Sequence, residues 1–371
     1  MNNQVIKTAD DYGVCNLIDN GILKALRAKS LTTVSVIVTH PHYKERVEKL
    51  LVLQKELKDK GFEFGIGLHF CITSGQTANE NPGHNSTLLE VGNTFRTFNY
   101  YPFNKIKDVD VSRELNDQII RLSKLIGVEN IDHIANHHNI VYYNKGMFEA
   151  YAAVAAEKKI PIRTPMSWFR KFHKIDDLPD YDEKFLSGAA RRGAKLGMWR
   201  KFPQTSYGNI IKRMSFATHL NLKSTDVLCE YLYGACDKEL FEEFNEDVGI
   251  KVVDHSLKQF KTGKRTENIK DAQNKTAEKA GKKKFDKLER MYEEKAKSGG
   301  LSMELIFHLA DSGELDPLLV GLDNFDDEND IHGINAGYFE TRKRELTMIK
   351  AIDWSSFKTS LSLNYITFKE L

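Results

Sequence analysis

The chain lacks several features that would place it in a specialised class of protein. Its four cysteines form no CxxC pair, so reduced thiols are expected rather than disulfides or a zinc knuckle. No segment approaches the roughly 18 apolar residues that a membrane span needs, and the N-terminus lacks the basic segment and apolar core of a signal peptide. The chain also has no large excess of positive or negative charge, because its formal net charge is only +2. These absences predict a cytoplasmic protein with no nucleic-acid and no membrane partner.

What the chain does contain is a regular alternation of strand-like and helix-like segments. Hydrophobic residues make up 41% of the 371 residues, enough to bury a substantial core. Strands separated by helices pair in parallel, so this order predicts an α/β layered or barrel fold. Strands are expected at 5–9, 33–39, 62–70, 131–143, 160–165 and 301–308, and helices at 17–26, 45–60, 111–125, 147–158 and 338–352.

Other segments show weaker patterns. Residues 73–100 are rich in Ser, Thr, Asn and Gly and are expected to form a long loop, and an acidic loop is expected at 323–330. Residues 251–297 are strongly charged and basic, with three consecutive lysines at 282–284. Aromatic residues are not interleaved with these cations, so a solvated helix or insertion is favoured over a nucleic-acid surface. Residues 357–368 are expected to add one or two short elements.

Two adjacent carboxylates, Asp10 and Asp11, stand where the first predicted strand ends, and Gly13 follows them. Neighbouring strand residues point to opposite faces, so the two carboxylates are not expected to share a role. One could bind a metal ion while the other accepts a proton. The structural alternative is that Asp11 caps the following helix and Asp10 is a solvated turn residue. The pair alone leaves both interpretations open.

Histidines lie at the ends of three further predicted strands: His69, then His133 with His137 and His138, and finally His308. The carboxyl ends of parallel strands gather on one face of a sheet or barrel, where active sites are built. One aspartate and two histidines are a common ligand set for a divalent ion and leave positions open for water and substrate. A lone histidine in such a core is more often structural, but three strand ends beside an Asp-Asp pair favour a metal-dependent hydrolase.

The second of these segments, 131–143, offers more than one candidate ligand. Because side chains alternate along a strand, His138 is expected on one face, and on the other face His133, Ala135, His137 and Asn139. His137 is therefore the ligand candidate, with His133 as its neighbour.

Five segments, in this order, resemble the successive motifs of the YdjC-like carbohydrate deacetylases, which include the chitooligosaccharide deacetylases: 8–13, 67–75, 133–139, 162–163 and 303–308. Residues 342–346 also resemble the closing helix of that family. The resemblance covers nearly the whole chain and implies a distorted (β/α) TIM-like barrel of the polysaccharide-deacetylase type. It further implies one domain, 1–371, in which the charged, lysine-rich residues 236–300 are an insertion.

The resemblance implies a role for each matching residue. Asp11, His69 and His137 would ligate a divalent metal ion. Mg²⁺ and Zn²⁺ rank close together, because imidazole ligands suit zinc whereas family members are often described with magnesium. Asp10 would be the general base, and His308 the general acid or a group that orients the substrate. The implied reaction removes an N-acetyl group from an amino sugar or short chitooligosaccharide.

Three further residues are expected to bind the saccharide substrate: Thr73, Arg163 and Glu304. Arg163 could bind an anionic group of the substrate or hold Asp10 in its ionised form, and a purely structural ion pair is an equal alternative. The sequence also allows a homodimer.

The chain departs from the family pattern in three places. Asn139 stands where the family has a second histidine, Ala135 where it has aspartate, and residues 309–311 where it has Pro-Gly. The ligands themselves are retained, so hydrolysis is still expected, but these changes affect substrate identity, the support of His137 and the placement of His308. Two alternatives remain: a divergent barrel acting on another amide, and a non-enzymatic saccharide or protein binder that uses 251–297 as its contact surface.

Overall fold

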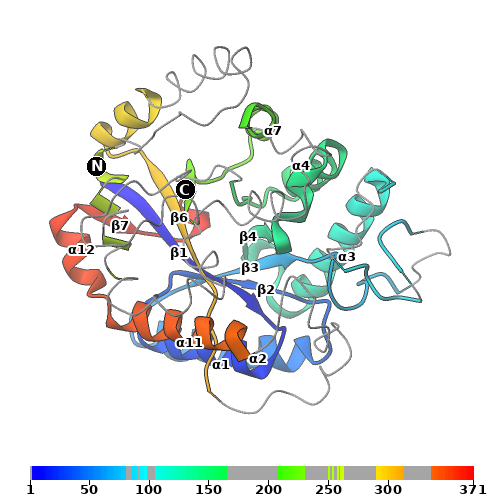
Figure 1. The fold of residues 1–371 in the computed structure, drawn as a ribbon, viewed down its shortest axis with the longest axis horizontal. Coiled ribbons are helices and arrows are strands. Elements are labelled where there is room, and N and C mark those ends of the chain that lie inside the picture. The colour runs from blue at the N-terminus through cyan, green and yellow to red at the C-terminus, as the bar shows by residue number, and fades with distance from the viewer. Residues whose placement is uncertain are drawn as a thin grey trace.

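A computed structural model describes residues 2–80, 86–90, 92–97, 105–164, 207–229, 290–312 and 336–371, with 250, 253–254, 257–258 and 260–262 (Figure 1). Within these residues, seven strands form one sheet in the order β4-β3-β2-β1-β6-β5, with β7 beside β1. All of the pairings between them are parallel. The strands are β1 (Asn3–Tyr12), β2 (Thr33–Val36), β3 (Gly65–Phe70), β4 (Ile131–Asn136), β5 (Val227–Cys229), β6 (Ser302–Phe307) and β7 (Leu363–Tyr365).

Helices cover the outer side of this sheet, which curves into a half-barrel (Figure 1). On the first of them Ile18, Ile22 and Leu26 are buried at four-residue spacing, so one apolar stripe faces the strands. The predicted α/β class is therefore confirmed. The described helices are α1 (Asn16–Arg27), α2 (Tyr43–Lys58), α3 (Asp108–Ile126), α4 (Lys145–Lys158), α7 (Tyr207–His219), α11 (Ala336–Ala351) and α12 (Trp354–Ser360), with short 3₁₀ segments η2 (Val128–Asn130), η3 (His137–Tyr143) and η8 (Phe368–Glu370).

The central strand, β1, separates two environments. Val5 and Ala9 join the large apolar cluster that includes the helices. Ile6, on the opposite face, packs with Ile366 and Phe368 in a separate small cluster. Because side chains alternate, the inner face of β1 continues toward its carboxyl end and delivers Asp10 to the interior of the half-barrel.

The C-terminal residues fill the interior of the half-barrel near β4. The ring of Phe368 stacks on that of His133 with centroids 4.2 Å apart. The main-chain N–H groups of Phe368 and Lys369 donate to the Asp132 carboxylate at 3.3 and 3.1 Å. Strand β3 makes room for this cluster with glycine, because a Cβ at Gly67 would lie 2.3 Å from the His133 ring. The predicted C-terminal elements therefore anchor the chain end inside the fold.

Two predicted strands differ from those observed. The strand expected at 131–143 ends at Asn136, and His137–Tyr143 is the 3₁₀ segment η3. His138 and Asn139 have φ of 58° and 56°, left-handed values that break the alternation of side chains assumed for this segment. The strand expected at 160–165 is reduced to a single bridge between Ile134 and Ile162.

Several predictions fall outside the described residues. These are the acidic loop at 323–330 and most of the insertion at 236–300, so the division 1–371 with an insertion remains a proposal. None of the described helices has the length and apolar character that crossing a membrane requires.

Lys7, on the outer face of β1, is only 2% exposed. Its Nζ lies 4.3 Å from the ring centroid of Trp354 and 4.4 Å from that of Tyr365. Burial, with a smaller effect of Lys358, lowers the pKa of Lys7 from 10.5 to about 7. The unfolded chain therefore binds more protons between about pH 7 and 10.5, and the free energy of unfolding rises with pH across that window.

Lys7→Met is expected to stabilise the protein at pH 7. The lowered pKa corresponds to about 5 kcal/mol, and the two aromatic rings offset about 2 kcal/mol of it, so a gain of about 3 kcal/mol is expected. Urea unfolding should show this difference in the free energy of unfolding between the variant and the wild type at pH 7, and the difference should nearly disappear at pH 10. Lys350→Met, at an exposed position of α11, is the control and should show no such gap. A gap that is independent of pH would contradict the assignment.

Candidate metal centre

Three side chains from the carboxyl ends of three parallel strands meet in one cluster. Asp11 lies near the end of β1, His69 near the end of β3, and His137 directly after β4. Asp11 Oδ1 lies 3.3 Å from His69 Nε2 and 3.1 Å from His137 Nδ1, and the two histidine nitrogens are 3.2 Å apart. The structure thus brings together the three residues predicted as metal ligands.

The donor atoms of this cluster fit a single divalent ion. An ion bound about 2.0 Å from each of three ligands in a tetrahedral arrangement separates them by about 3.3 Å, close to the three distances observed. Asp11 Oδ1 is buried and accepts no hydrogen bond within the described part of the chain. A carboxylate oxygen left in this state is costly unless a cation or donor approaches it. Asp11, His69 and His137 are therefore suited to hold such an ion.

The backbone around Asp11 has an unusual conformation. Asp11 itself has a left-handed φ of 71°, which is rare for a non-glycine residue and frequent at functional sites. Gly13 follows with φ of 101°, and a Cβ there would lie 2.4 Å from the Ile37 carbonyl oxygen. Its N–H donates to Asp19 Oδ1 at 2.7 Å. This tight turn, rather than a helix cap, explains the glycine after the Asp-Asp pair.

Arg342 of α11 holds the second oxygen of Asp11. Its Nη2 donates to Asp11 Oδ2 at 2.6 Å, and both side chains are buried. Burial acts to raise the pKa of Asp11, but Arg342 and then His137 outweigh it and hold that pKa well below its ordinary value. Asp11 is therefore ionised at neutral pH, as a metal ligand must be.

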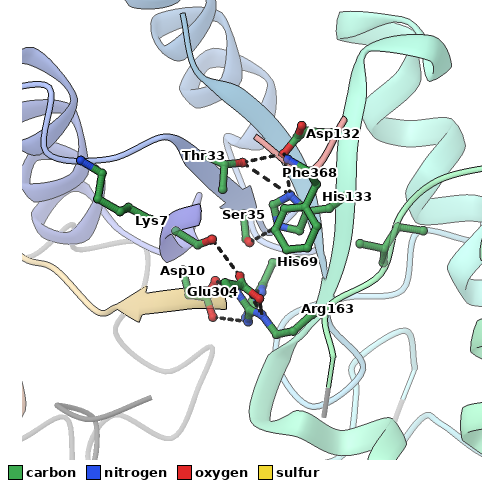
Figure 2. Close-up of polar contacts among 12 residues, drawn as sticks. Lys7, Asp10, Thr33, Ser35, His69, Asp132, His133, Arg163, Glu304 and Phe368 are labelled. Carbon is green, nitrogen blue, oxygen red and sulfur yellow. Dashed lines mark hydrogen bonds and ion pairs between the residues drawn. The ribbon is translucent and has the colours of Figure 1, made fainter. Parts of the chain in front are cut away.

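Asp10 lies beside this cluster in a buried network of ion pairs (Figure 2). Arg163 donates to both of its oxygens, at 2.6 and 2.8 Å, and also donates to Glu304 at 2.7 Å. Thr8 Oγ1 donates to the same Glu304 oxygen at 2.7 Å. Burial acts to raise the pKa of Asp10, but Arg163 and, to a smaller extent, His69 hold it well below its ordinary value. Of the roles predicted for Arg163, the geometry favours the one that keeps Asp10 ionised.

Arg163 and Glu304 are 1% and 0% exposed, and their charged groups are directed at each other and at Asp10. Neither side chain presents a free polar atom to an open face in this arrangement. In this structure both side chains orient Asp10, and their role in substrate binding stays a prediction.

His308 follows β6 directly and is 7% exposed. Its main-chain N–H donates to Glu345 Oε1 at 2.9 Å. Burial lowers the pKa of His308 to about 3, so its imidazole is neutral at neutral pH. Burial likewise raises the pKa of Glu345 to about 8. Both groups are therefore mostly uncharged near neutral pH.

Thr73, also predicted to bind substrate, contacts the metal cluster through a second histidine. Its Oγ1 lies 2.9 Å from His138 Nδ1, and the His138 ring packs on that of His137 with centroids 3.7 Å apart. The left-handed backbone of His138 places both rings on the same side. Thr73 is only 3% exposed and lies next to the candidate ligand His137 through His138, and its role in substrate binding stays a prediction.

His133 is not a neighbour of the metal cluster, contrary to the prediction. Figure 2 shows it in a separate cluster with Ser35 and Asp132. His133 Nε2 lies 2.9 Å from Ser35 Oγ, and its Nδ1 lies 3.1 Å from Asp132 Oδ2. The residue is fully buried and covered by Phe368, so it has the structural role of a satisfied core histidine.

Two buried residues of the site, Arg342 and Glu345, were not predicted. Their helix resembled the closing helix of a family, but its run of alternating charges is also typical of a solvent-exposed helix. The signal that could have found them is their three-residue spacing, which places both on one face of α11.

The described strands, helices and clustered donor atoms define an α/β half-barrel protein with a candidate metal centre at the carboxyl ends of its strands. Comparison with known families then gives a more specific result. The family model described as YdjC-like protein matches residues 4–356, and this chain belongs to that family.

Curated relatives carry related names. A chitooligosaccharide deacetylase of Proteus mirabilis is 30% identical over 161 residues, which are 43% of this chain and 58% of that protein. A carbohydrate deacetylase of Enterococcus faecalis is 26% identical over 163 residues, 44% of this chain and 58% of that protein. A chitooligosaccharide deacetylase of Salmonella paratyphi C is 25% identical over 236 residues, 62% of this chain and 81% of that protein. The chain thus spans 58% of the length of the first two relatives.

A solved structure from Enterococcus faecalis V583 has a similar fold. That protein is provisionally described as a cellobiose-phosphate cleavage protein. The TM-score is 0.60 at 14% identity, and the match covers 100% of this chain and 99% of the other. At this identity the likeness concerns the fold, and it agrees with the predicted barrel-like α/β class.

Proposed function

We propose that this protein is a metal-dependent amide hydrolase that removes the N-acetyl group from an amino sugar or a short chitooligosaccharide. The observation that carries the proposal is the cluster of Asp11, His69 and His137, with the ionised Asp10 beside it, His69 Nδ1 being 3.8 Å from Asp10 Oδ1. The names of the relatives supply the substrate class. The enzyme activity and the saccharide partner are both part of this proposal.

Asp11, His69 and His137 would hold the divalent ion. When bound, such an ion polarises an amide carbonyl and lowers the pKa of water, which an unreactive N-acetyl group requires. Two imidazoles and one carboxylate suit Zn²⁺, and Mg²⁺ remains the other candidate.

Asp10 would accept the proton of the attacking water. Arg163 keeps its carboxylate ionised and fixes its orientation, so the group is ready to accept a proton in a defined direction. The low pKa makes Asp10 a weak base, which is compatible with catalysis when the water is itself made acidic.

His308 would orient the substrate and then act on the departing amine. Because its imidazole is neutral in the resting state, it first serves as a hydrogen-bonding group that orients the substrate. The proton that Asp10 takes from the attacking water would then pass to His308, which would donate a proton to the departing amine as its bond to the acetyl carbon breaks. Thr73, through His138, would hold His137 in place.

The remaining expectations belong to the same proposal. The protein would act in the cytoplasm as a single domain of residues 1–371 with the charged insertion 236–300, and it would use no nucleic-acid or membrane partner. A homodimer is the assembly that a size measurement in solution should examine first.

His69→Ala is expected to abolish both metal binding and acetate release. Removing one of three ligands leaves two, which are too few to retain the ion against dialysis. The measurements are elemental analysis after mild dialysis and acetate release across a panel of N-acetylated saccharides, each with added Mg²⁺ or Zn²⁺.

His219→Ala is the matched control, because His219 is an exposed histidine on α7. It should retain both properties. Retained turnover of the true substrate in His69→Ala would contradict the proposal. A wild-type protein that holds a stoichiometric metal but releases no acetate from any saccharide would instead point to another amide substrate.

A further inference from the structure

Helix α11 reaches the candidate metal centre with Arg342, a side chain to which neither the family resemblance nor the proposed reaction gives a role. Arg342 is 2% exposed although it lies on a helix rich in charged residues. It is separated from its partner Asp11 by 331 positions in the sequence, so only the tertiary structure brings the two together.

The two oxygens of Asp11 have different surroundings. Oδ2 accepts the hydrogen bond from Arg342 at 2.6 Å. Oδ1 faces His69 Nε2 at 3.3 Å and His137 Nδ1 at 3.1 Å. The guanidinium of Arg342 thus holds Oδ2, and of the two oxygens only Oδ1 is directed at the histidine nitrogens.

A carboxylate can bind a metal ion through one oxygen or through both. The second mode needs both oxygens turned toward the ion, and large oxygen-preferring ions use it often. A charge-assisted hydrogen bond of 2.6 Å between two buried groups resists that rotation.

We propose that Arg342 is a positioning residue that confines Asp11 to binding the metal ion through Oδ1 alone, and thereby sets the metal preference of the site. Three ligand atoms, one from each side chain, favour ions of low coordination number such as Zn²⁺ and Co²⁺. Freeing Oδ2 adds a fourth protein ligand atom and favours ions that accept more oxygen, such as Mn²⁺. This inference rests on the proposed function only in requiring that the three residues bind a divalent ion.

The backbone of α11 is tied to the site independently of Arg342. Glu345, one turn further along, accepts from the His308 N–H at 2.9 Å. The Ala310 N–H lies 3.4 Å from the main-chain oxygen of Arg342. These contacts hold the helix near the centre when the Arg342 side chain is changed, so that a substitution tests the guanidinium and not the presence of the helix.

The test compares the metal-free wild-type protein with Arg342→Met. Zn²⁺ and Mn²⁺ dissociation constants are measured by competition with a chromophoric chelator, and Co²⁺ is added as a spectroscopic probe. We expect the ratio of Zn²⁺ to Mn²⁺ affinity to fall about tenfold in the variant. We also expect weaker visible absorption of bound Co²⁺, because this absorption decreases as the coordination number rises.

Two substitutions on the same helix serve as controls. Lys350→Met changes an exposed side chain, and Lys343→Met alters a side chain that pairs with Glu340 at the surface. Both should leave the affinity ratio and the Co²⁺ spectrum unchanged. Arg342→Lys keeps the charge but not the planar guanidinium, and should give an intermediate ratio; it replaces Arg342→Met if that variant does not fold.

The outcomes separate this inference from the proposed function. If the wild-type protein binds Zn²⁺ and the Arg342 variants match its affinity ratio and Co²⁺ spectrum, the role of Arg342 is wrong and the metal site stands. If the wild-type protein binds none of the three ions, the metal site fails and the inference fails with it.

Discussion

Asp10→Asn is expected to lower kcat by about 10³-fold while leaving the metal content unchanged. Asparagine has nearly the same shape as aspartate, but its amide oxygen does not accept a proton from water at neutral pH, and such a proton transfer is typically worth about 10²- to 10⁴-fold. The donor atoms of Asp11, His69 and His137 are unaffected by this change. The measurements are acetate release from the preferred saccharide and elemental analysis of the same preparation.

Asp11→Asn gives the contrasting result, because it should weaken both metal binding and turnover. Asp311→Asn is a control near His308, where Asp311 pairs with Lys24 at 2.5 Å outside the candidate centre, and it should change neither. An Asp10→Asn variant with wild-type kcat, or one that has lost its metal, would contradict the division of roles between the two adjacent carboxylates.

Arg163→Met is expected to destabilise the protein by about 3–5 kcal/mol, the range for removing one partner of a buried ion pair. The substitution leaves Asp10 and Glu304 buried without their shared cation, and these groups are 3% and 0% exposed. Urea unfolding of the metal-free protein measures the effect. Arg113→Met, at a half-exposed pair with Asp110, should change the free energy of unfolding by less than about 1 kcal/mol.

The same ion pair predicts the pH dependence of stability. The pKa of Asp10 lies below its ordinary value of 3.8 in the folded protein, so its contribution is present above that value and is lost as the pH falls toward the folded pKa. Arg163→Met should lack this acid-dependent loss. Adding Glu304→Leu to Arg163→Met should recover part of the stability, since it removes one of the two unpaired charges. An equal midpoint for wild type and Arg163→Met would contradict this account.

Much of the fold could be predicted from local patterns. The apolar spacing of α1 and the β-branched run of β2 gave the correct element type because each depends on residues a few positions apart. Strand ends were less accurate: β2 stops at Val36 and β4 at Asn136, each several residues earlier than expected. The reason at β4 is the left-handed pair His138 and Asn139, whose conformation no period-two pattern reveals.

The candidate site was likewise predicted only in part. The sequence pointed to Asp11, His69 and His137 as candidate ligands because strand ends in a parallel sheet share one edge. Side-chain alternation selected His137 over His138, and the family resemblance selected Asp11 over Asp10. His133 was placed wrongly because it lies inside β4, where it contacts Ser35 and Phe368, whereas His137 lies just beyond the end of that strand.

By itself, the sequence determined which residue types the site contains and in what order along the chain they occur, because strand ends and family motifs are local properties. Only the tertiary structure decided which of those residues form ion pairs with one another. Arg163 pairs with Asp10 across 153 positions and with Glu304 across 141, and Arg342 reaches Asp11 from a helix near the other end of the chain. Such pairings depend on which elements pack together, and no local pattern encodes the direction of a buried guanidinium.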